Sequence, residues 1–174
     1  LVIFRILFGF LLFYHVCSIL FNGTVYKNFI EPPHSFTFIG LEFLQPLPGN
    51  GMYYYFGFMA LLALLIMTGA WYRLTMTCFA ILWTLQYLVQ KSGYNNHYYL
   101  ELLLCWLMAF VPANGYCSVD AKRNPVVKTY TCPQWVNWLF AAQVAIMYLF
   151  AAVSKLDASW FSGKFLAIRF SRLS

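Results

Sequence analysis

Hydrophobic residues along the chain gather into five long runs, separated by stretches richer in proline, glycine and polar side chains. The runs cover about residues 1–21, 52–71, 74–90, 97–112 and 135–154. A helix that crosses a bilayer needs about 20 mostly apolar residues, with a range of roughly 17–25. The runs show no alternation with a period of two, which argues against a membrane β-barrel. The pattern predicts an all-α, polytopic transmembrane helical bundle with about five spans.

The connection between the first and second runs is long and unusually apolar. Its sequence, "NGTVYKNFIEPPHSFTFIGLEFLQPLPGNG", holds four of the seven prolines but is also rich in Phe, Ile and Leu. A solvated linker would be more polar, so we expect a re-entrant or interfacial loop that packs on the bundle. The "YR" dipeptide at residues 72–73 is predicted to form the tight turn between the second and third runs.

Composition places the chain in the membrane. Hydrophobic residues make up 62% of it and charged residues 9%, whereas soluble domains average about 45–50% and about 25%. The lipid bilayer is therefore an expected partner. The net charge of +6 is typical of basic residues that flank spans and meet anionic headgroups. The chain has no Gly-rich phosphate loop and no zinc-ligand spacing, so we expect neither nucleic acid nor a metal.

Alternation of the spans assigns the connections to two faces of the membrane. The long first loop, the "KSGYNNH" loop and the residues after the fifth run share one face. The N-terminus, the "YR" turn and the "DAKRN" loop share the other. Lysines and arginines divide almost evenly between the two faces, so the positive-inside rule does not orient the chain.

Five ionisable residues fall within or at the ends of the apolar runs: Arg5, His15, His97, Glu101 and Lys155. Such residues are rare in membranes, and each is a candidate functional group. Position alone favours a structural hydrogen bond for Arg5 and for His15. His97 and Glu101 are four residues apart, so they lie on one face of a helix.

The stretch "YNNHYYLELLL" contains the first of two candidate sites. Asn95 or Asn96 can cap the helix that follows, and the positive end of that helix favours an anion. Two interpretations remain open from spacing alone. In the first, His97 lies at the membrane interface and Glu101 forms a hydrogen bond with another helix. In the second, both residues belong to a reactive site.

Lys155, in "AAVSKLDASW", is the second candidate. It follows Gln143, Met147 and Ala151 at a spacing of four, a stripe that suits contact with other helices or with a cavity. In one interpretation the Lys155 side chain extends to the membrane interface, pairs with Asp157 and compensates the negative partial charge at the C-terminus of the helix. The other is a lysine in a poorly solvated pocket, where it can act as a base.

Several motifs together resemble one family. "YNNHYYL", "VPANGYCSVD" and "AAVSKLDASW" occur in the order and spacing of the membrane domain of vitamin K-dependent gamma-carboxylases. "VIFRILFGFLLFYHV", "FIEPPHSFTFIGLEFLQPLP" and "GAWYR" resemble the bacterial branch, known as horizontally transferred transmembrane domain (HTTM) proteins. The resemblance extends along most of the chain.

The resemblance implies a chemistry. In that family a lysine deprotonates a reduced naphthoquinol, and reaction with O2 then produces a base that removes a γ proton from glutamate. The carbanion captures CO2, and the quinol leaves as its epoxide. The implied activity is quinol-dependent carboxylation of protein glutamate coupled to quinol epoxidation. Its cofactor is reduced vitamin K or a menaquinol-type naphthoquinol, its co-substrates are O2 and CO2, and its protein partner is a protein or peptide glutamate substrate.

Matching the motifs residue by residue assigns roles. Lys155 corresponds to the base, and His97 to the histidine that supports the reacting intermediates. The expected cofactor-binding residues are Asn96, Asn95, Tyr98, Tyr99 and Trp160. The resemblance also implies a bacterial inner membrane protein whose site faces the periplasm or lumen.

The chain differs from the animal carboxylases in length. Those enzymes continue with further membrane segments and a large extramembrane domain that holds the protein substrate. We therefore expect residues 1–174 to form a single transmembrane domain that is a fragment of a longer chain. The alternative function is a non-catalytic membrane scaffold or quinone-binding subunit, with other membrane subunits as partners. A proton-coupled transporter ranks last, because no inverted repeat is recognisable.

Overall fold

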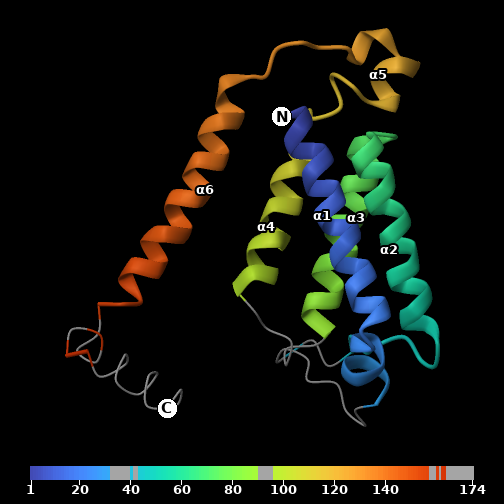
Figure 1. Cartoon of the computed structure of the whole chain (residues 1–174), viewed down its shortest axis with the longest axis vertical. Coiled ribbons are helices and arrows are strands. Elements are labelled where there is room, and N and C mark those ends of the chain that lie inside the picture. The colour runs from blue at the N-terminus through green and yellow to red at the C-terminus, as the bar shows by residue number, and fades with distance from the viewer. Residues whose placement is uncertain (32–39, 41–42, 90–95, 157–159, 161, 164–174) are drawn as a thin grey trace. The chain divides into compact units, whose positions relative to one another are not determined.

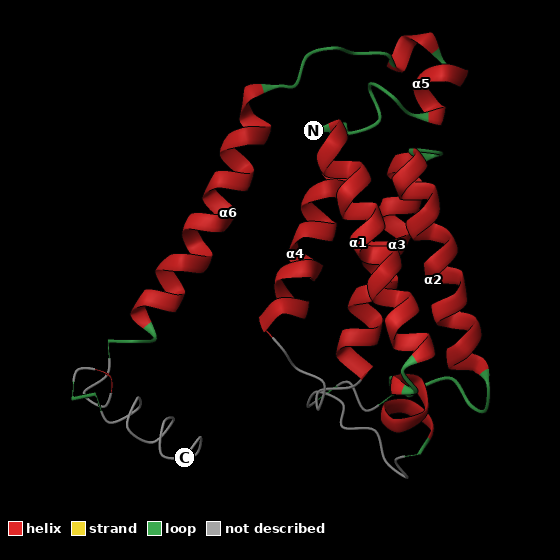
Figure 2. Ribbon diagram, viewed as in Figure 1, coloured by secondary structure: helices red, strands yellow, loops and turns green. Residues whose placement is uncertain are grey.

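The computed structural model describes residues 1–31, 40, 43–89, 96–156, 160 and 162–163. Its elements, in chain order, are α1 (Val2–Phe21), the π-helix η1 (Tyr26–Ile30), α2 (Gly51–Thr68), α3 (Tyr72–Val89), α4 (Asn96–Phe110), α5 (Val119–Arg123), the 3-10 helix η3 (Pro125–Val127) and α6 (Gln134–Val153) (Figure 1). The described residues contain no strand (Figure 2), which confirms the all-α prediction. The chain divides into an N-terminal unit, residues 1–130, and a C-terminal unit, residues 131–174, which we describe separately.

Helices α1 to α4 of the N-terminal unit run alternately up and down (Figure 1). Helix α1 packs on α2, α2 on α3, and α3 on α4. The interior is filled by fully buried apolar side chains, among them Leu12, Val16, Phe56, Met59, Ile66, Met76, Phe79 and Met108. Many large apolar side chains on the outside remain exposed. This distribution is typical of a bundle whose outer surface contacts lipid. The N-terminus and residues 111–130 lie at one end of the bundle, and residues 22–31 and 43–50 lie at the other, as alternation predicts (Figure 1).

A glycine sets the distance between the first two helices. A Cβ atom on Gly9 would lie 2.8 Å from the backbone of Met67, closer than real Cβ contacts. Small residues at helix contacts let membrane helices approach, because packing rather than hydrophobic exclusion drives their association. Gly9 therefore permits the close contact of α1 with α2.

The number of helices that can cross a bilayer fits the prediction only roughly. Among the described residues, α1, α2 and α6 are long and apolar enough. Helix α4 has 15 residues, and α3 has 18 but carries several threonines. Those hydroxyls donate to carbonyls within their own helix, as Thr77 does to Arg73 (2.7 Å) and Thr84 to Ala80 (2.6 Å). Each of the five predicted runs nevertheless coincides with a helix.

The turn between α2 and α3 differs from the prediction. Tyr72 and Arg73 are the first residues of α3, and the turn is formed by residues 69–71. Gly69 ends α2 in the left-handed region (φ 69°, ψ 38°), a conformation that glycine adopts without steric cost. A Cβ there would lie 2.6 Å from the Cβ of Ser118. A glycine C-cap therefore ends α2 earlier than its apolar pattern indicated.

Arg5 connects α1 to the segment that follows α4. Its side chain is fully buried, and its guanidinium donates to the carbonyls of Ala113 (3.0 Å) and Cys117 (2.7 Å). Delocalised charge and a rigid set of donors make arginine suited to such buried contacts. The predicted structural hydrogen bond of Arg5 is confirmed.

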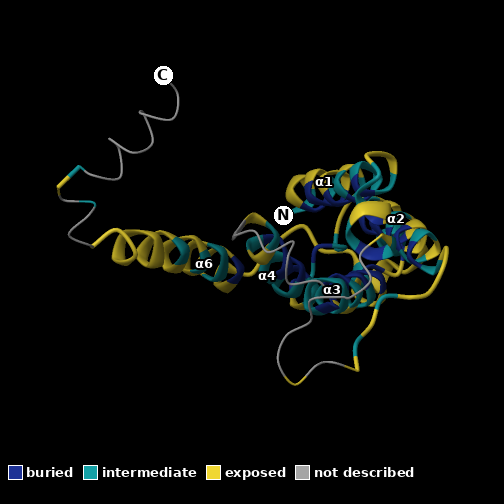
Figure 3. Cartoon of the chain, turned by 90° about the horizontal axis from the view of Figure 1, so that it is seen from below, coloured by how far each residue is buried: buried dark blue, intermediate teal, exposed yellow. Residues whose placement is uncertain are grey.

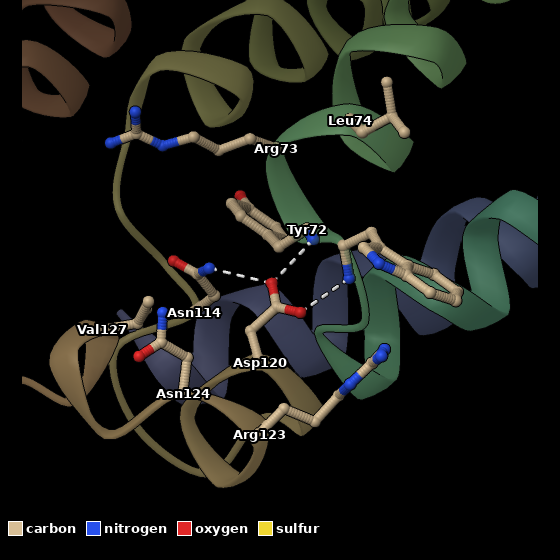
Figure 4. A pocket seen from close by; sticks show the side chains of 9 residues that line it. Tyr72, Arg73, Leu74, Asn114, Asp120, Arg123, Asn124 and Val127 are labelled. Carbon is tan, nitrogen blue, oxygen red and sulfur yellow. Dashed lines mark hydrogen bonds between the residues drawn. The ribbon is translucent and has the colours of Figure 1, made fainter.

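Asp120 of α5 caps the start of α3. Its carboxylate accepts hydrogen bonds from the backbone N–H groups of Trp71 (2.7 Å) and Tyr72 (2.9 Å) and from the side-chain amide of Asn114 (2.9 Å) (Figure 4). Partial burial opposes its ionisation, but the three donors and nearby Arg123 outweigh that effect and hold the pKa of Asp120 below its ordinary value. The first N–H groups of a helix lack partners within the helix, so this carboxylate supplies them.

Replacing Asp120 with asparagine should lower stability at neutral pH by about 1 kcal/mol, because one capping oxygen and its charge are lost. Since the pKa of Asp120 is lower in the folded protein, its stabilising contribution exists above the unfolded pKa and is lost as pH falls through the folded pKa. The difference between wild type and variant should therefore shrink on acidification. Thermal unfolding in detergent, followed from pH 7 down to about pH 3, measures this.

Asn124 provides the control for that experiment, because its side chain caps η3 by accepting from Val126 N–H (3.1 Å) and does not titrate. The destabilisation caused by Asn124→Ala should not change as the Asp120 carboxylate titrates. A constant deficit for Asp120→Asn over the same range would contradict an ionised cap.

Helix α6, in the C-terminal unit, is apolar along its length. Among the residues of α6 only Val136 is buried, and Figure 3 shows most of the helix as exposed. Of the predicted stripe, Gln143 and Met147 are half-buried, whereas Ala151 and Lys155 are exposed. A surface of this composition suits contact with lipid.

Candidate functional site

A cavity of about 360 Å³ lies between α1 and α4 in the N-terminal unit. Its apolar lining consists of Phe8, Leu11, Leu100 and Leu104, and its polar lining of Tyr14, His15, Ser18, His97, Tyr98 and Glu101. Pockets for small molecules typically enclose roughly 300–1,000 Å³ and are mostly apolar with a few polar groups. The cavity has the size and the lining of a small-molecule site.

His15 and Glu101 form a hydrogen-bonded pair in this cavity. Nδ1 of His15 lies 2.8 Å from Oε2 and 3.1 Å from Oε1 of Glu101. The two side chains are only 18% and 11% exposed, so the pair connects α1 and α4 largely away from solvent. The structural hydrogen bond predicted for His15 is confirmed, and Glu101 does bind another helix.

Aromatic rings enclose the imidazole of His15. The ring of Trp83 lies 5.0 Å away, centroid to centroid, in an edge-to-face arrangement, and that of Tyr98 lies 4.9 Å away. Trp83 is buried and belongs to α3, whereas Tyr98 belongs to α4. Three helices therefore hold His15 in one orientation.

Of the predicted site residues in the N-terminal unit, two line the cavity. His97 and Tyr98 lie about one turn before Glu101 on α4. Tyr99 is exposed instead, with its ring 6.3 Å from that of Tyr87 on α3. Asn95 lies outside the described residues, and only the backbone of Asn96, the first residue of α4, is described. His97 and Tyr98 thus share one cavity with the His15–Glu101 pair.

The other two predicted residues meet in the C-terminal unit. Lys155 is exposed just beyond the end of α6, and its Nζ lies 5.2 Å from the ring centroid of Trp160. This distance is typical of a cation–π contact. Asp157, the predicted partner of Lys155, lies outside the described residues. A cavity shared by Lys155 and His97 would join the two units and stays a prediction.

The positions of His15 and Glu101 in the sequence could have predicted that the two residues pair. His15 stands six residues before the end of α1, and Glu101 five residues after the start of α4. At a rise of 1.5 Å per residue, they lie about 9 and 7 Å from the same end of the bundle. Alternation of the spans puts the end of α1 and the start of α4 on the same face of the membrane. The similar distances of His15 and Glu101 from that face would therefore have predicted that the two side chains can meet.

A second cavity, of about 330 Å³, surrounds Asp120 at the other end of the N-terminal unit. Arg73, Arg123 and Asn124 are among its lining residues (Figure 4). The Asp120 carboxylate already accepts three hydrogen bonds there. This cavity is therefore part of the cap of α3.

A family model for the HTTM domain matches residues 1–173. The chain belongs to the HTTM domain family. This is the domain found in vitamin K-dependent gamma-carboxylase, so the resemblance is confirmed, and the chain is a membrane protein of a carboxylase-related family. No solved structure matches the chain significantly.

The match to the HTTM domain runs through both units, so the motifs around His97 and Lys155 fall within one family pattern. In this HTTM domain the α1–α4 cavity combines apolar walls with an imidazole–carboxylate pair and a second imidazole. Such an arrangement can bind a flat apolar ring and exchange hydrogen bonds with its substituents. Within the described residues, no group of three His, Cys, Asp or Glu side chains could hold a metal ion.

Proposed function

We propose that this HTTM domain is a vitamin K-dependent gamma-carboxylase-like enzyme, which carboxylates protein glutamate and couples that reaction to quinol epoxidation. One observation carries the proposal. His97 and Tyr98 of the family motif line a mostly apolar cavity of about 360 Å³ between α1 and α4. The family match over residues 1–173 supports the same chemistry.

The cavity residues fit a reduced naphthoquinol, either vitamin K or a menaquinol. Such a cofactor has a flat apolar ring and two hydroxyl groups. Phe8, Leu11 and Leu104 offer apolar contacts to the ring, while the side chain of His97 offers a hydrogen bond to a hydroxyl. When bound, the quinol supplies the reducing power that, with O2, drives removal of the glutamate γ proton.

Each motif residue has a proposed task. Lys155 accepts a hydroxyl proton through Nζ, and Trp160 lies against that group. His97 lies in the first turn of α4, where the positive end of the helix favours developing negative charge. Asn95 and Asn96 would hydrogen-bond the cofactor, and the ring of Tyr98, which lines the cavity, would exclude water. CO2 is the second co-substrate, and the protein partner is a protein or peptide that carries glutamate.

The location follows the same proposal. The chain would lie in a bacterial inner membrane, with the His97 end of the N-terminal unit toward the periplasm or lumen. An impermeant reagent that labels a cysteine introduced for Lys27, near the end of α1, should then react from the periplasmic side of intact cells.

Epoxidation by purified full-length protein in lipid nanodiscs tests the proposal. The assay contains 2-methyl-1,4-naphthoquinol, O2, radiolabelled bicarbonate and a peptide with glutamate, and both epoxide and fixed label are expected. His97→Ala should lower the epoxidation rate about 10²- to 10³-fold, because the cavity loses a donor near the developing charge. Tyr116→Ala, a change to an exposed ring at the other end of the unit, is the control and should be silent.

A different result would favour the alternative function. Quinol binding without epoxide or fixed label, together with copurification at constant stoichiometry with other membrane subunits, would indicate a scaffold or quinone-binding subunit. Equal epoxidation by His97→Ala and wild type would contradict the role of His97.

A further inference from the structure

We propose that His15, oriented by Glu101, is a proton-accepting group of the α1–α4 cavity and recognises a hydroxyl group of an aromatic alcohol bound there. The inference rests on the proposed function in one respect, since a naphthoquinol is the alcohol used to test it. Neither residue belongs to the motif that assigns Lys155 and His97. All the groups involved lie in the N-terminal unit.

The contact with Glu101 determines which nitrogen of His15 meets a ligand. We assign the proton of the pair to Nδ1, which lies 2.8 and 3.1 Å from the Glu101 oxygens, because a carboxylate in its ionised form only accepts hydrogen bonds. Nε2 then holds the lone pair of the neutral ring. Carboxylate–histidine pairs in hydrolases work in this way, with the carboxylate fixing the tautomer and stabilising the imidazolium that forms.

Aromatic rings cover part of His15, and the cavity borders it as well. Trp83 and Tyr98 lie against its ring at 5.0 and 4.9 Å, which prevents rotation away from Glu101. The His15 side chain keeps 18% of its surface exposed and is one of the residues that line the cavity. A hydroxyl in the cavity can therefore reach a fixed imidazole that is already paired with a carboxylate.

The proton transfer is balanced without any further reagent. His15 accepts the hydroxyl proton at Nε2, and the electron pair of the broken O–H bond stays on the ligand oxygen. The resulting imidazolium remains paired with the Glu101 carboxylate, 2.8 Å from Nδ1. Return of the proton restores the neutral ring.

Anaerobic binding measurements test the acceptor. 2-Methyl-1,4-naphthoquinol and 2-methyl-1,4-naphthoquinone share one ring system, but only the quinol donates hydroxyl protons. Without O2 neither is turned over, so the readout is affinity alone. The wild-type protein should bind the quinol at least about tenfold more tightly, the usual value of one hydrogen bond with an ionised partner nearby.

The variant His15→Phe/Glu101→Gln removes the acceptor while it preserves side-chain volume and leaves no unpaired buried charge. It should lose the preference for the quinol, by about tenfold, and keep the affinity for the quinone. Tyr54→Phe removes a hydroxyl from an exposed tyrosine of α2 that does not line the cavity. This control should keep the full preference.

The tautomer of His15 provides a second readout on the protein without ligand. Nitrogen-15 NMR at neutral pH should show the proton on Nδ1 and none on Nε2, with the signal assigned from its loss in the double variant. An imidazolium, or a proton on Nε2, would overturn the acceptor role.

The possible outcomes separate this inference from the proposed function. Full preference for the quinol in the double variant would overturn the role of His15 and leave carboxylation standing. Loss of the preference, in a protein that forms no epoxide in air, would support His15 and reject the carboxylase. A wild-type protein that binds neither compound would overturn both.

Discussion

Replacing Lys155 with alanine is expected to abolish quinol epoxidation and to leave the fold intact. A positioned acid or base typically contributes about 10²- to 10⁴-fold to a rate, so the decrease should lie in that range. Lys155 is exposed and follows the end of α6, and its Nζ lies over the ring of Trp160. An exposed side chain of this kind contributes little to stability, so the variant should fold as the wild type does.

Lys128 provides a matched control for this variant. Its Nζ lies 5.5 Å from the ring centroid of Tyr130, so it too is an exposed lysine over an aromatic ring. Lys128→Ala should retain the wild-type epoxidation rate. Lys155→Arg should be as inactive as Lys155→Ala, because a guanidinium keeps its proton in proteins. Normal turnover by Lys155→Ala would reject Lys155 as the base.

Replacing Arg5 with methionine should cause the largest loss of stability among single changes in the N-terminal unit. The guanidinium is fully buried and is the donor to the carbonyls of Ala113 and Cys117. Each hydrogen bond with a charged group is worth about 1.5–3 kcal/mol, so the loss of both should cost roughly 3–6 kcal/mol. Methionine occupies a similar volume, which limits the effect of an empty cavity.

Reversible unfolding in mixed micelles measures the stability of the Arg5 variant. Arg73→Met makes the same chemical change at an exposed arginine of α3, and it should change the free energy of unfolding by at most about 0.5 kcal/mol. Similar losses for both variants would show that removal of positive charge, rather than of buried donors, governs the effect.

Much of the fold could be predicted because a bilayer imposes a simple rule. Each apolar run of roughly 20 residues became a helix whose ends lie within about three residues of the prediction. The second run was the least accurate, since its pattern continued to Trp71 whereas α2 ends at Thr68. Contacts with residues far along the chain cause this difference. Gly69 needs space beside Ser118, and Asp120 caps α3, so residues far along the chain determine this turn.

Some of the residues that line the α1–α4 cavity could be named from the sequence, whereas their functional roles stay predictions. Motif spacing identified His97 and Tyr98, which do line one cavity. Spacing within a helix cannot reveal a partner on another helix, and His15 and Glu101 are 86 residues apart. Their similar distances from the same end of the bundle were the evidence that the sequence offered for this pair. The role of Lys155 as a base depends on the motif, because the stripe that precedes it indicated only contact with other helices or with a cavity.

The short segment between α4 and α5 has a consequence for the order of events during biosynthesis. It supplies the carbonyls that bind Arg5, and the α5 residue that follows it, Asp120, caps the start of α3. Synthesis proceeds from the N-terminus, so α1, α2 and α3 reach the membrane before these partners exist. Until about residue 120 leaves the ribosome, a buried guanidinium and the first amides of α3 must be satisfied by water, lipid headgroups or the insertion machinery. These contacts of α1 and α3 therefore form only after residues 113–120 have been synthesised.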